Sequence, residues 1–545
     1  MIRRYEMPRD RMFRLLCVMG IVGGAWGGSP ATGRGGEGGA DEEEIAAVAV
    51  APAATGAESA PAAAASGAAA GAVAAVPQPS RPLRCRVKLD VTGELIAPAG
   101  RDAPPIRRPI TVDARFDFEE AAVREAAVPT VARSYTDAVA TLRIGGEEAV
   151  TCLANDARRL LVVRQGTTPE PYLAEAFLTA AERDLLSLPF DPVLLDDLLP
   201  RGAVPVGEGW QVAADTAAGL LAIDTIESGA IEARLDEVTD GRGRVSLRGT
   251  VEGWVDGVPA QVTVSGGCAA PAREADAEDT DAATPAWRIE PRIEHVAVMI
   301  RERRQAGHVA PGLDVEARLV VARSPSAGSG DGVQPTAHDA AAKEGKGPAA
   351  TVATRRRGPG RPGRVWHRDA DGRFDLVHDA RWRTVEDGPA GLVMRFVDHG
   401  ALVGQCSVVA GAAGDQPPTI ADVRSDIERS LAGQVTGVDE ATEEERADGV
   451  RVVRVVSSGT AAGLPFTWIH AVLVGTDGGR VDVTCMVQAS MRQRFADADK
   501  DLVGSLALGP ARSGGGRSGQ DVAESATTAI REARTPAASA PAASR

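Results

Sequence analysis

The sequence lacks the short motifs by which most enzymes and cofactor-binding proteins are identified. It contains no Gly-x-Ser-x-Gly, no phosphate-binding loop, and no Gly-x-Gly-x-x-Gly placed between a strand and a helix as a dinucleotide fingerprint requires. No two of its six cysteines form a Cys-x-x-Cys pair, so the common zinc and thioredoxin-like motifs are absent as well. His378, His399 and His470 fall in one region, but no pair of them has the i, i+4 spacing of helical metal ligands. We therefore predict no catalytic residue, no metal site and no cofactor.

Lysine is scarce, and acidic residues outnumber basic ones. Only four lysines occur, and 75 Asp and Glu residues against 60 Lys and Arg leave a net charge of −15. Because binding to nucleic-acid phosphates requires a basic face, this balance argues against general affinity for nucleic acids. The segment Arg355–Arg364 does contain the Gly-Arg-Pro core of an AT-hook, a motif that lies in the minor groove of A·T-rich DNA. It is a single copy in a low-complexity tract of an acidic chain, so we interpret it as a basic tether and predict no nucleic-acid partner.

Long apolar runs are missing except near the N-terminus. Several arginines up to Arg14 precede the apolar run Leu15–Trp26, and small residues follow it, which is the pattern of an export signal. A run of about a dozen residues is too short to cross a bilayer, which takes roughly 20. We predict a signal peptide over residues 1–27, with an uncleaved anchor as the alternative. The predicted location is extracytoplasmic, periplasmic or secreted, with no stable transmembrane span after processing.

Three low-complexity tracts divide the rest of the chain. Residues 28–80, 324–363 and 509–545 are rich in Ala, Gly, Pro and Ser, and such tracts bury too little apolar area to offset the loss of chain entropy. We predict that these tracts are disordered linkers and a disordered tail. The blocks that remain, 81–323 and 364–508, are each long enough to form a core.

The first block alternates apolar and polar residues with the period of a half-buried strand. The run Ile110–Phe118 is one example, and Asp240-Gly241 and Asp256-Gly257 lie between similar runs, where tight hairpin turns are expected. A helical insertion is predicted over Leu173–Leu188, followed by a short helix that begins after Asp191.

This order of strands, helical insertion and meander faintly resembles the half-barrel of LolA/LppX-type envelope proteins. The resemblance implies an apolar cavity for lipid or acyl chains. In that case Phe116, Phe118, Leu247 and Val251 would line the cavity, whereas in an ordinary solid core they would pack on one another. Both alternatives remain open at this stage.

The second block has strands, a helix that begins after Thr419, a hairpin at Asp477-Gly478 and a predicted final helix over Met491–Leu506. Its residues Phe374–His378, Arg381-Trp382, Leu464–Trp468 and Asp501–Leu506 resemble the PsbP-type α/β/α sandwich superfamily. The resemblance implies a non-enzymatic docking or assembly domain and names no particular partner.

The cysteines allow two interpretations. Cys485 lies in register with Val481, Val483 and Val487, so it belongs to a core face. Buried thiols explain such positions, because free cysteine packs as a small hydrophobic residue. If a disulfide exists, Cys406 and Cys485 are its candidate partners.

The predicted fold class is α+β, with two domains joined by disordered linkers. The first is a mostly antiparallel, half-barrel-like β domain with a helical insertion, and the second an antiparallel-sheet α/β/α sandwich. The predicted function is that of an exported, non-catalytic docking or assembly module that binds envelope proteins. The alternative is a carrier of lipid or another hydrophobic ligand in the first domain, and a hydrolase with an unrecognised site is a third, weaker hypothesis.

Overall fold

The computed structural model describes residues 82–97, 104–123, 126, 128–275, 285–307, 310–326, 355–398, 401–411, 418–431 and 433–509. All of these residues fall within one compact unit of the chain. The predicted signal peptide, the tract 28–80 and most of the tracts 324–363 and 509–545 lie outside the described residues.

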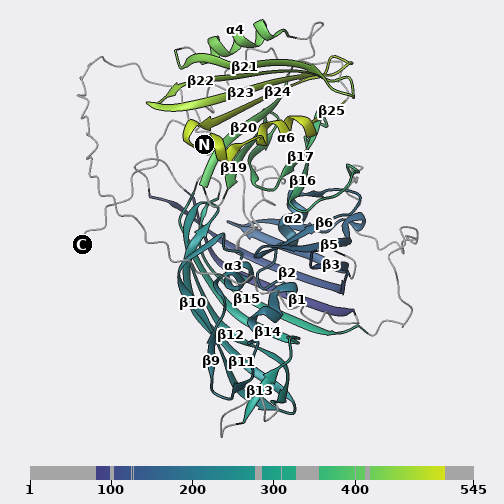
Figure 1. The fold of residues 1–545 in the computed structure, drawn as a ribbon, viewed down its shortest axis with the longest axis vertical. Coiled ribbons are helices and arrows are strands. Elements are labelled where there is room, and N and C mark those ends of the chain that lie inside the picture. Colours follow the sequence, from purple (N-terminus) through teal and green to yellow (C-terminus); the bar gives the residue numbers. More distant parts are fainter. Residues whose placement is uncertain are drawn as a thin grey trace, which may run out of the picture. The chain divides into compact units, whose positions relative to one another are not determined.

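Antiparallel β-structure dominates the described residues (Figure 1). The largest sheet has 14 strands in the order β6-β5-β3-β2-β1-β15-β14-β12-β11-β10-β9, with β4, β8 and β13 paired at its sides. These strands are β1 Leu83–Ala97, β2 Ile106–Ala122, β3 Thr130–Ile144, β4 Glu147–Cys152, β5 Arg159–Gln165, β6 Thr168–Tyr172, β8 Val204–Pro205, β9 Gly209–Gln211, β10 Thr225–Thr239, β11 Arg242–Val255, β12 Val258–Glu274, β13 Ala286–Ile289, β14 His295–Arg304 and β15 Gly312–Pro325.

Two smaller sheets contain the remaining strands. The first has four strands in the order β25-β17-β16-β7, and the second has seven in the order β18-β19-β20-β24-β23-β22-β21. Their bounds are β7 Leu178–Thr179, β16 Arg364–Arg368, β17 Phe374–Asp379, β25 Ala507–Leu508, β18 Trp382–Gly388, β19 Gly391–Asp398, β20 Ala401–Gly411, β21 Val435–Glu445, β22 Arg451–Ala461, β23 Leu464–Val474 and β24 Arg480–Gln488.

The helices in the described residues are short. They are α2 Ala180–Leu186, α3 Ala214–Leu221, α4 Ile420–Ser430, α5 Arg492–Phe495 and α6 Ala498–Ser505, with 3₁₀ turns η2 Asn155–Ala157, η3 Pro192–Leu198 and η5 Ala489–Met491. The longest, α4, has 11 residues, whereas β2 and β12 have 17 each. The predicted α+β class with a helical insertion is therefore wrong, and the chain is mainly β.

The predicted helices were too long, because apolar residues at helical spacing continue beyond the residues that form helix. The predicted helix Leu173–Leu188 contains only the seven residues of α2, whose Thr179 and Glu182 form a capping box. The residues ahead of it form a bend at Ala174 and Glu175, and the carbonyls of these two residues accept hydrogen bonds from Gly360 and Gly358 instead of helical ones. The predicted helix Met491–Leu506 is likewise divided into η5, α5 and α6, and its break lies at Ala496.

The local signals for strands and turns were interpreted correctly. Along β1, buried and exposed residues alternate, and Val87 and Cys85 lie opposite Phe116 and Phe118 of β2. At the turn between β11 and β12, Asp256 and Gly257 have φ values of 49° and 80°. Two successive positive φ values are those of a type I′ turn, which matches the twist of the flanking strands, so the predicted hairpin is confirmed.

Arginines from three strands of the large sheet bind the short turn η3. Arg133 of β3 pairs with Asp191, Arg323 of β15 with Asp196, and Arg164 of β5 with Asp197. The leucines of η3 are buried in the same hydrophobic cluster as the sheet. These ion pairs hold η3 against strands that are far from it in sequence.

The four positions that distinguish a cavity from a solid core are packed. Phe116, Phe118, Leu247 and Val251 are exposed by 3%, 0%, 1% and 1% and belong to one continuous cluster with the leucines of η3. A lipid-sized cavity beside these side chains would leave part of their surface accessible. The packing therefore favours the solid core at these positions.

Candidate functional site

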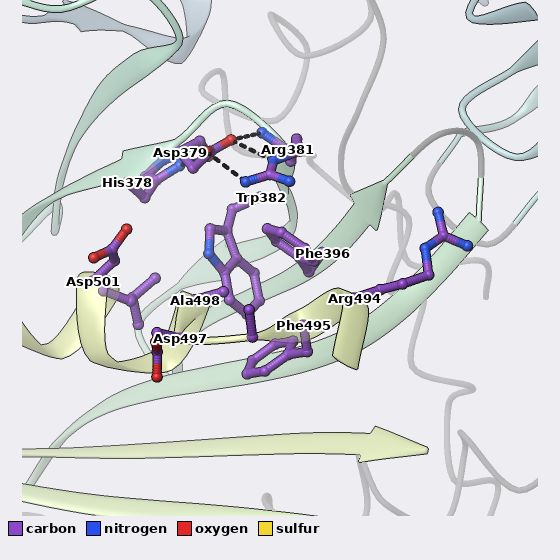
Figure 2. A pocket seen from close by; sticks show the side chains of 12 residues that line it. His378, Asp379, Arg381, Trp382, Phe396, Arg494, Phe495, Asp497, Ala498 and Asp501 are labelled. Atoms are coloured by element: carbon purple, nitrogen blue, oxygen red, sulfur yellow. Dashed lines mark hydrogen bonds and ion pairs between the residues drawn. The ribbon is translucent and has the colours of Figure 1, made fainter. Parts of the chain in front are cut away.

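A cavity of about 250 Å³ lies among residues of β17, β18, β19 and the segment around α5 and α6 (Figure 2). It forms where β17 turns into β18 and where the predicted final helix is broken. The side chains that line it are His378, Asp379, Arg381, Trp382, Phe396, Arg494, Phe495, Ala496, Asp497, Ala498, Asp501 and Leu502.

Three buried aromatic rings form the apolar part of the wall. Trp382 lies 5.1 Å from Phe396 and 5.8 Å from Phe495 between ring centroids, and Phe396 lies 5.7 Å from Phe495. The two contacts of Phe495 are edge-to-face, the geometry that aromatic quadrupoles favour. The rings keep this wall rigid and leave it apolar.

The two arginines of the site are bound to carboxylates of the protein itself. Arg381 donates to Asp379 with both Nε and Nη2, each at 3.1 Å, and to Asp398 with Nη1 at 3.1 Å. Arg494 donates to the same Asp398 with Nε at 3.1 Å. Burial raises the pKa of Asp379, but the hydrogen bonds from Arg381 lower it by more. The pKa of this carboxyl is therefore below its usual range. These groups therefore largely neutralise one another.

Asp497 and Asp501 are the most exposed charges of the site. Their side chains are 70% and 61% exposed, and each has one cationic partner, Lys500 at 2.9 Å and Arg364 at 3.1 Å. Lys500 lowers the pKa of Asp497, so this carboxyl is ionised at neutral pH. Ion pairs this exposed are weak and easily exchanged. The mouth of the pocket thus offers negative charge to a ligand.

His378 adds no positive charge at neutral pH. It is buried, and burial lowers its pKa to about 4 against a smaller opposing effect of its hydrogen bond to the Asp379 carbonyl. Its Nδ1 lies 2.9 Å from that carbonyl oxygen, which can only accept, so Nδ1 carries the proton of the neutral ring. The site is therefore an apolar wall with accessible carboxylates beside it.

The break between α5 and α6 strains the backbone at Ala496. Its φ and ψ are 48° and −119°, which residues with a Cβ rarely adopt. We expect Ala496→Gly to raise the free energy of unfolding by about 0.5–1 kcal/mol, because the relief of strain exceeds the extra chain entropy of glycine. Urea unfolding followed by tryptophan fluorescence measures this change. The matched Ala498→Gly, in the first turn of α6, should lower it by about 0.5–1 kcal/mol. If both substitutions changed the free energy of unfolding in the same direction, the backbone at Ala496 would not be strained.

The histidines singled out from the sequence do not form a site together. His378 lines the pocket, His470 lies on β23 beside Thr484, and His399 lies outside the described residues. Among the described residues there is no group of three or more His, Cys, Asp or Glu side chains placed to hold a metal ion. Sequence reasoning missed Asp497 and Ala496, since both lay inside a predicted helix. It also overlooked His367, which faces Asp387 at 3.8 Å.

Cys406 and Cys485 face each other on β20 and β24. Both are buried thiols in the structure, and a hydrogen bond with Cys406 together with burial raises the pKa of Cys485 well above its ordinary value. A thiol with a raised pKa reacts slowly as a nucleophile. The strand register brings the two residues together, and their oxidation to a disulfide stays a prediction.

Comparisons with known proteins show likeness of fold only. No protein-family model and no curated protein matches the chain. Cyanobacterial PsbP (CyanoP) from Synechocystis sp. PCC 6803 is 12% identical, with 30% of this chain and 98% of that chain covered and a TM-score of 0.23. The Ran-binding protein Mog1p of Saccharomyces cerevisiae is also 12% identical, with 27% and 95% covered and a TM-score of 0.22.

The structure of lipovitellin is 6% identical, with 47% of this chain and 26% of that chain covered and a TM-score of 0.25. A PsbP protein is thus among the solved structures to which this chain is similar, and the resemblance to LolA/LppX-type proteins stays a prediction. At these identities and TM-scores, the matches carry no argument about ligands. Among the described residues, no helix has the length and hydropathy needed to traverse a bilayer.

Proposed function

We propose that this protein is an exported, non-catalytic docking module and that its pocket receives a basic side chain of a protein partner. The observation that carries the proposal is the pairing of an apolar aromatic wall with two exposed carboxylates, Asp497 and Asp501, at one small cavity. A lysine or arginine of the partner would place its aliphatic stem against Ala496 and Ala498, apolar lining residues that are not buried, and its charged head near these carboxylates.

The size of the pocket favours a side chain over a whole cofactor or lipid. Its volume of about 250 Å³ is below the roughly 300–1,000 Å³ of sites that enclose small molecules. An acyl chain or a nucleotide would extend beyond it. The packed residues of the large sheet give no support to the alternative of a lipid carrier.

Charge favours a basic partner. The arginines of the pocket are bound to Asp379 and Asp398, which are less exposed than Asp497 and Asp501, so negative charge is the more accessible to a ligand. The net charge of −15 acts in the same direction at long range, since opposite charges speed the encounter of two proteins. Export and an envelope partner rest on the signal-like N-terminus and remain part of the proposal.

The double variant Asp497→Asn, Asp501→Asn is expected to lose its partner. The full chain is immobilised, incubated with envelope extract, and the captured proteins are quantified by mass spectrometry. We expect capture by the variant to fall at least tenfold, because two charge-assisted contacts worth about 1 kcal/mol each are removed. Capture by the wild type should also fall as the salt concentration rises from 50 to 300 mM.

Asp426→Asn, Asp439→Asn is the matched control. These two exposed carboxylates lie on α4 and β21, away from the lining of the pocket, and their loss changes the net charge by the same amount. The control should capture the same proteins as the wild type. Equal capture by all three proteins, or capture of no specific protein at all, would contradict the proposal.

A further inference from the structure

The segment Arg355–Gly363, here called the strap, binds to residues 155–182 of the chain. The amide of Gly358 donates to the Glu175 carbonyl at 3.1 Å and that of Gly360 to the Ala174 carbonyl at 3.0 Å. Arg357 and Ala176 form an antiparallel bridge next to these bonds. The backbone of the AT-hook-like sequence is therefore hydrogen-bonded to another part of the protein.

Arg355 fills a complete binding site for a guanidinium group. Its Nε and Nη2 donate to the two oxygens of Asp156, both at 3.0 Å. Its Nη1 and Nη2 donate to the two oxygens of Glu182 at 2.7 and 2.6 Å, and Nη1 also donates to the Phe177 carbonyl at 2.9 Å. All five N–H groups of the guanidinium thus have an acceptor, and two carboxylates bind it in the bidentate geometry specific to arginine.

The Glu182 carboxylate is also fixed by contacts other than those of the strap. Glu182 closes the capping box of α2, where its carboxylate accepts hydrogen bonds from the Thr179 amide and hydroxyl, both at 3.0 Å. Asp156 belongs to the turn η2. Glu182 is buried, so an empty site would leave its charge without a cation in a poorly solvated place. We call Asp156, Phe177 and Glu182 the arginine receptor.

Gly358 and Gly360 are required because the strap lies so close to residues 173–177 that a Cβ would clash with them. A Cβ on Gly360 would lie 1.5 Å from the Leu173 carbonyl oxygen and 2.7 Å from that of Ala176. A Cβ on Gly358 would lie 2.9 Å from the ring of Phe177. The arginine and the glycine spacing of the strap therefore match this surface together.

We propose that the arginine receptor is a binding site for an Arg-x-x-Gly-Pro-Gly peptide, that the strap is its tethered ligand, and that a free peptide of the same sequence binds there once the strap is displaced. Since 28 residues of sequence, 327–354, connect the strap to Ser326, its binding is intramolecular. A tether of this kind gives an effective concentration on the order of millimolar, so a free strand competes poorly with the intact strap.

The test measures binding of a fluorescent peptide with the sequence of residues 354–364 to the full-length protein by anisotropy. In Gly360→Ala the clash with Leu173 displaces the strap, and in Arg355→Ala the receptor loses its arginine without a clash. We expect the peptide to bind both variants at least tenfold more tightly than the wild type. Arg357→Ala changes an exposed arginine of the same strap and should bind the peptide as the wild type does.

Two further comparisons show whether the peptide occupies the receptor. Adding Glu182→Gln to Gly360→Ala should weaken peptide binding at least tenfold, and so should a peptide with lysine in place of Arg355, since lysine cannot donate bidentately. Circular dichroism shows which variants are folded. If Gly360→Ala does not fold, the same measurements are made with Arg355→Ala. Equal binding to all variants, or none to a folded Arg355→Ala, would overturn the proposal.

Discussion

Arg133→Ala is expected to lower the free energy of unfolding by about 3–5 kcal/mol, the usual result of removing one partner from a buried ion pair. Arg133 is only 2% exposed and donates to Glu120 at 2.8 Å and to Asp191 with Nη1 at 2.9 Å. Its guanidinium carbon also lies 4.9 Å from the centre of the Phe118 ring. Alanine would leave two buried carboxylates without a cation and a cavity beside the ring.

Arg133→Ala should also destabilise residues beyond the site of the substitution. Asp191 caps η3 by accepting from the Val193 amide at 2.9 Å, so its displacement would loosen the leucines that η3 buries against the sheet. Urea unfolding followed by tryptophan fluorescence measures the free energy, and hydrogen exchange of residues 192–198 reports the local effect.

Arg143→Ala is the control on the same strand. Arg143 pairs with Glu148 at 2.7 Å, but both side chains are about half exposed, so its loss should change stability by less than about 1 kcal/mol. A loss below about 1 kcal/mol for Arg133→Ala as well would show that the buried network contributes little to holding η3.

Acidification from pH 7 to 4 is expected to cost up to about 3 kcal/mol through His378 alone, at 1.36 kcal/mol per pKa unit. Burial lowers the pKa of this ring from 6.5 to about 4. The unfolded chain takes up a proton near pH 6.5, whereas the folded protein does so only near pH 4. The stability contribution is therefore complete above pH 6.5 and is lost as the pH falls to 4. Burial also lowers the pKa of His470 to about 4, which adds a loss of the same sign.

The variant His378→Asn isolates this effect. The asparagine amide can replace Nδ1 as donor to the Asp379 carbonyl but does not titrate. The difference in unfolding free energy between wild type and variant should change by about 2–3 kcal/mol in favour of the variant between pH 7 and 4. Urea unfolding at several pH values measures it. The variant is compared with the wild type at each pH because other groups titrate over the same range. Burial raises the pKa of Glu302 to about 7, so its contribution to stability increases as the pH falls, opposite to that of His378.

His295→Asn provides the control, since His295 is exposed on β14. It shows how the profile responds to the replacement of a histidine that is not buried. If the profile of His378→Asn did not differ from that of His295→Asn, the ring of His378 would be charged or solvated in the folded protein, and the description of the pocket as free of histidine charge would be wrong.

Strand positions and hairpin turns could be predicted from the sequence, because their causes are local. A side-chain period of two sets which face of β1 and β2 is buried, and an Asp-Gly pair permits the two positive φ values at the turn between β11 and β12. These signals need only the neighbouring residues. The balance of helix and strand was predicted less well, since a window of apolar residues at helical spacing does not reveal which backbone groups a distant segment will bind.

The sequence by itself therefore determined a chain that is rich in alternating strands, acidic and free of recognisable catalytic motifs. Only the tertiary structure decided that Ala496 breaks a predicted helix beside Trp382, that Arg133 meets Asp191 across 58 positions, and that Arg355 lies in the arginine receptor. The physical reason is that buried charge pairs and close backbone approaches depend on which segments meet after folding. Their energies come from desolvation and geometry, and neither quantity is encoded in the period or composition of a short window.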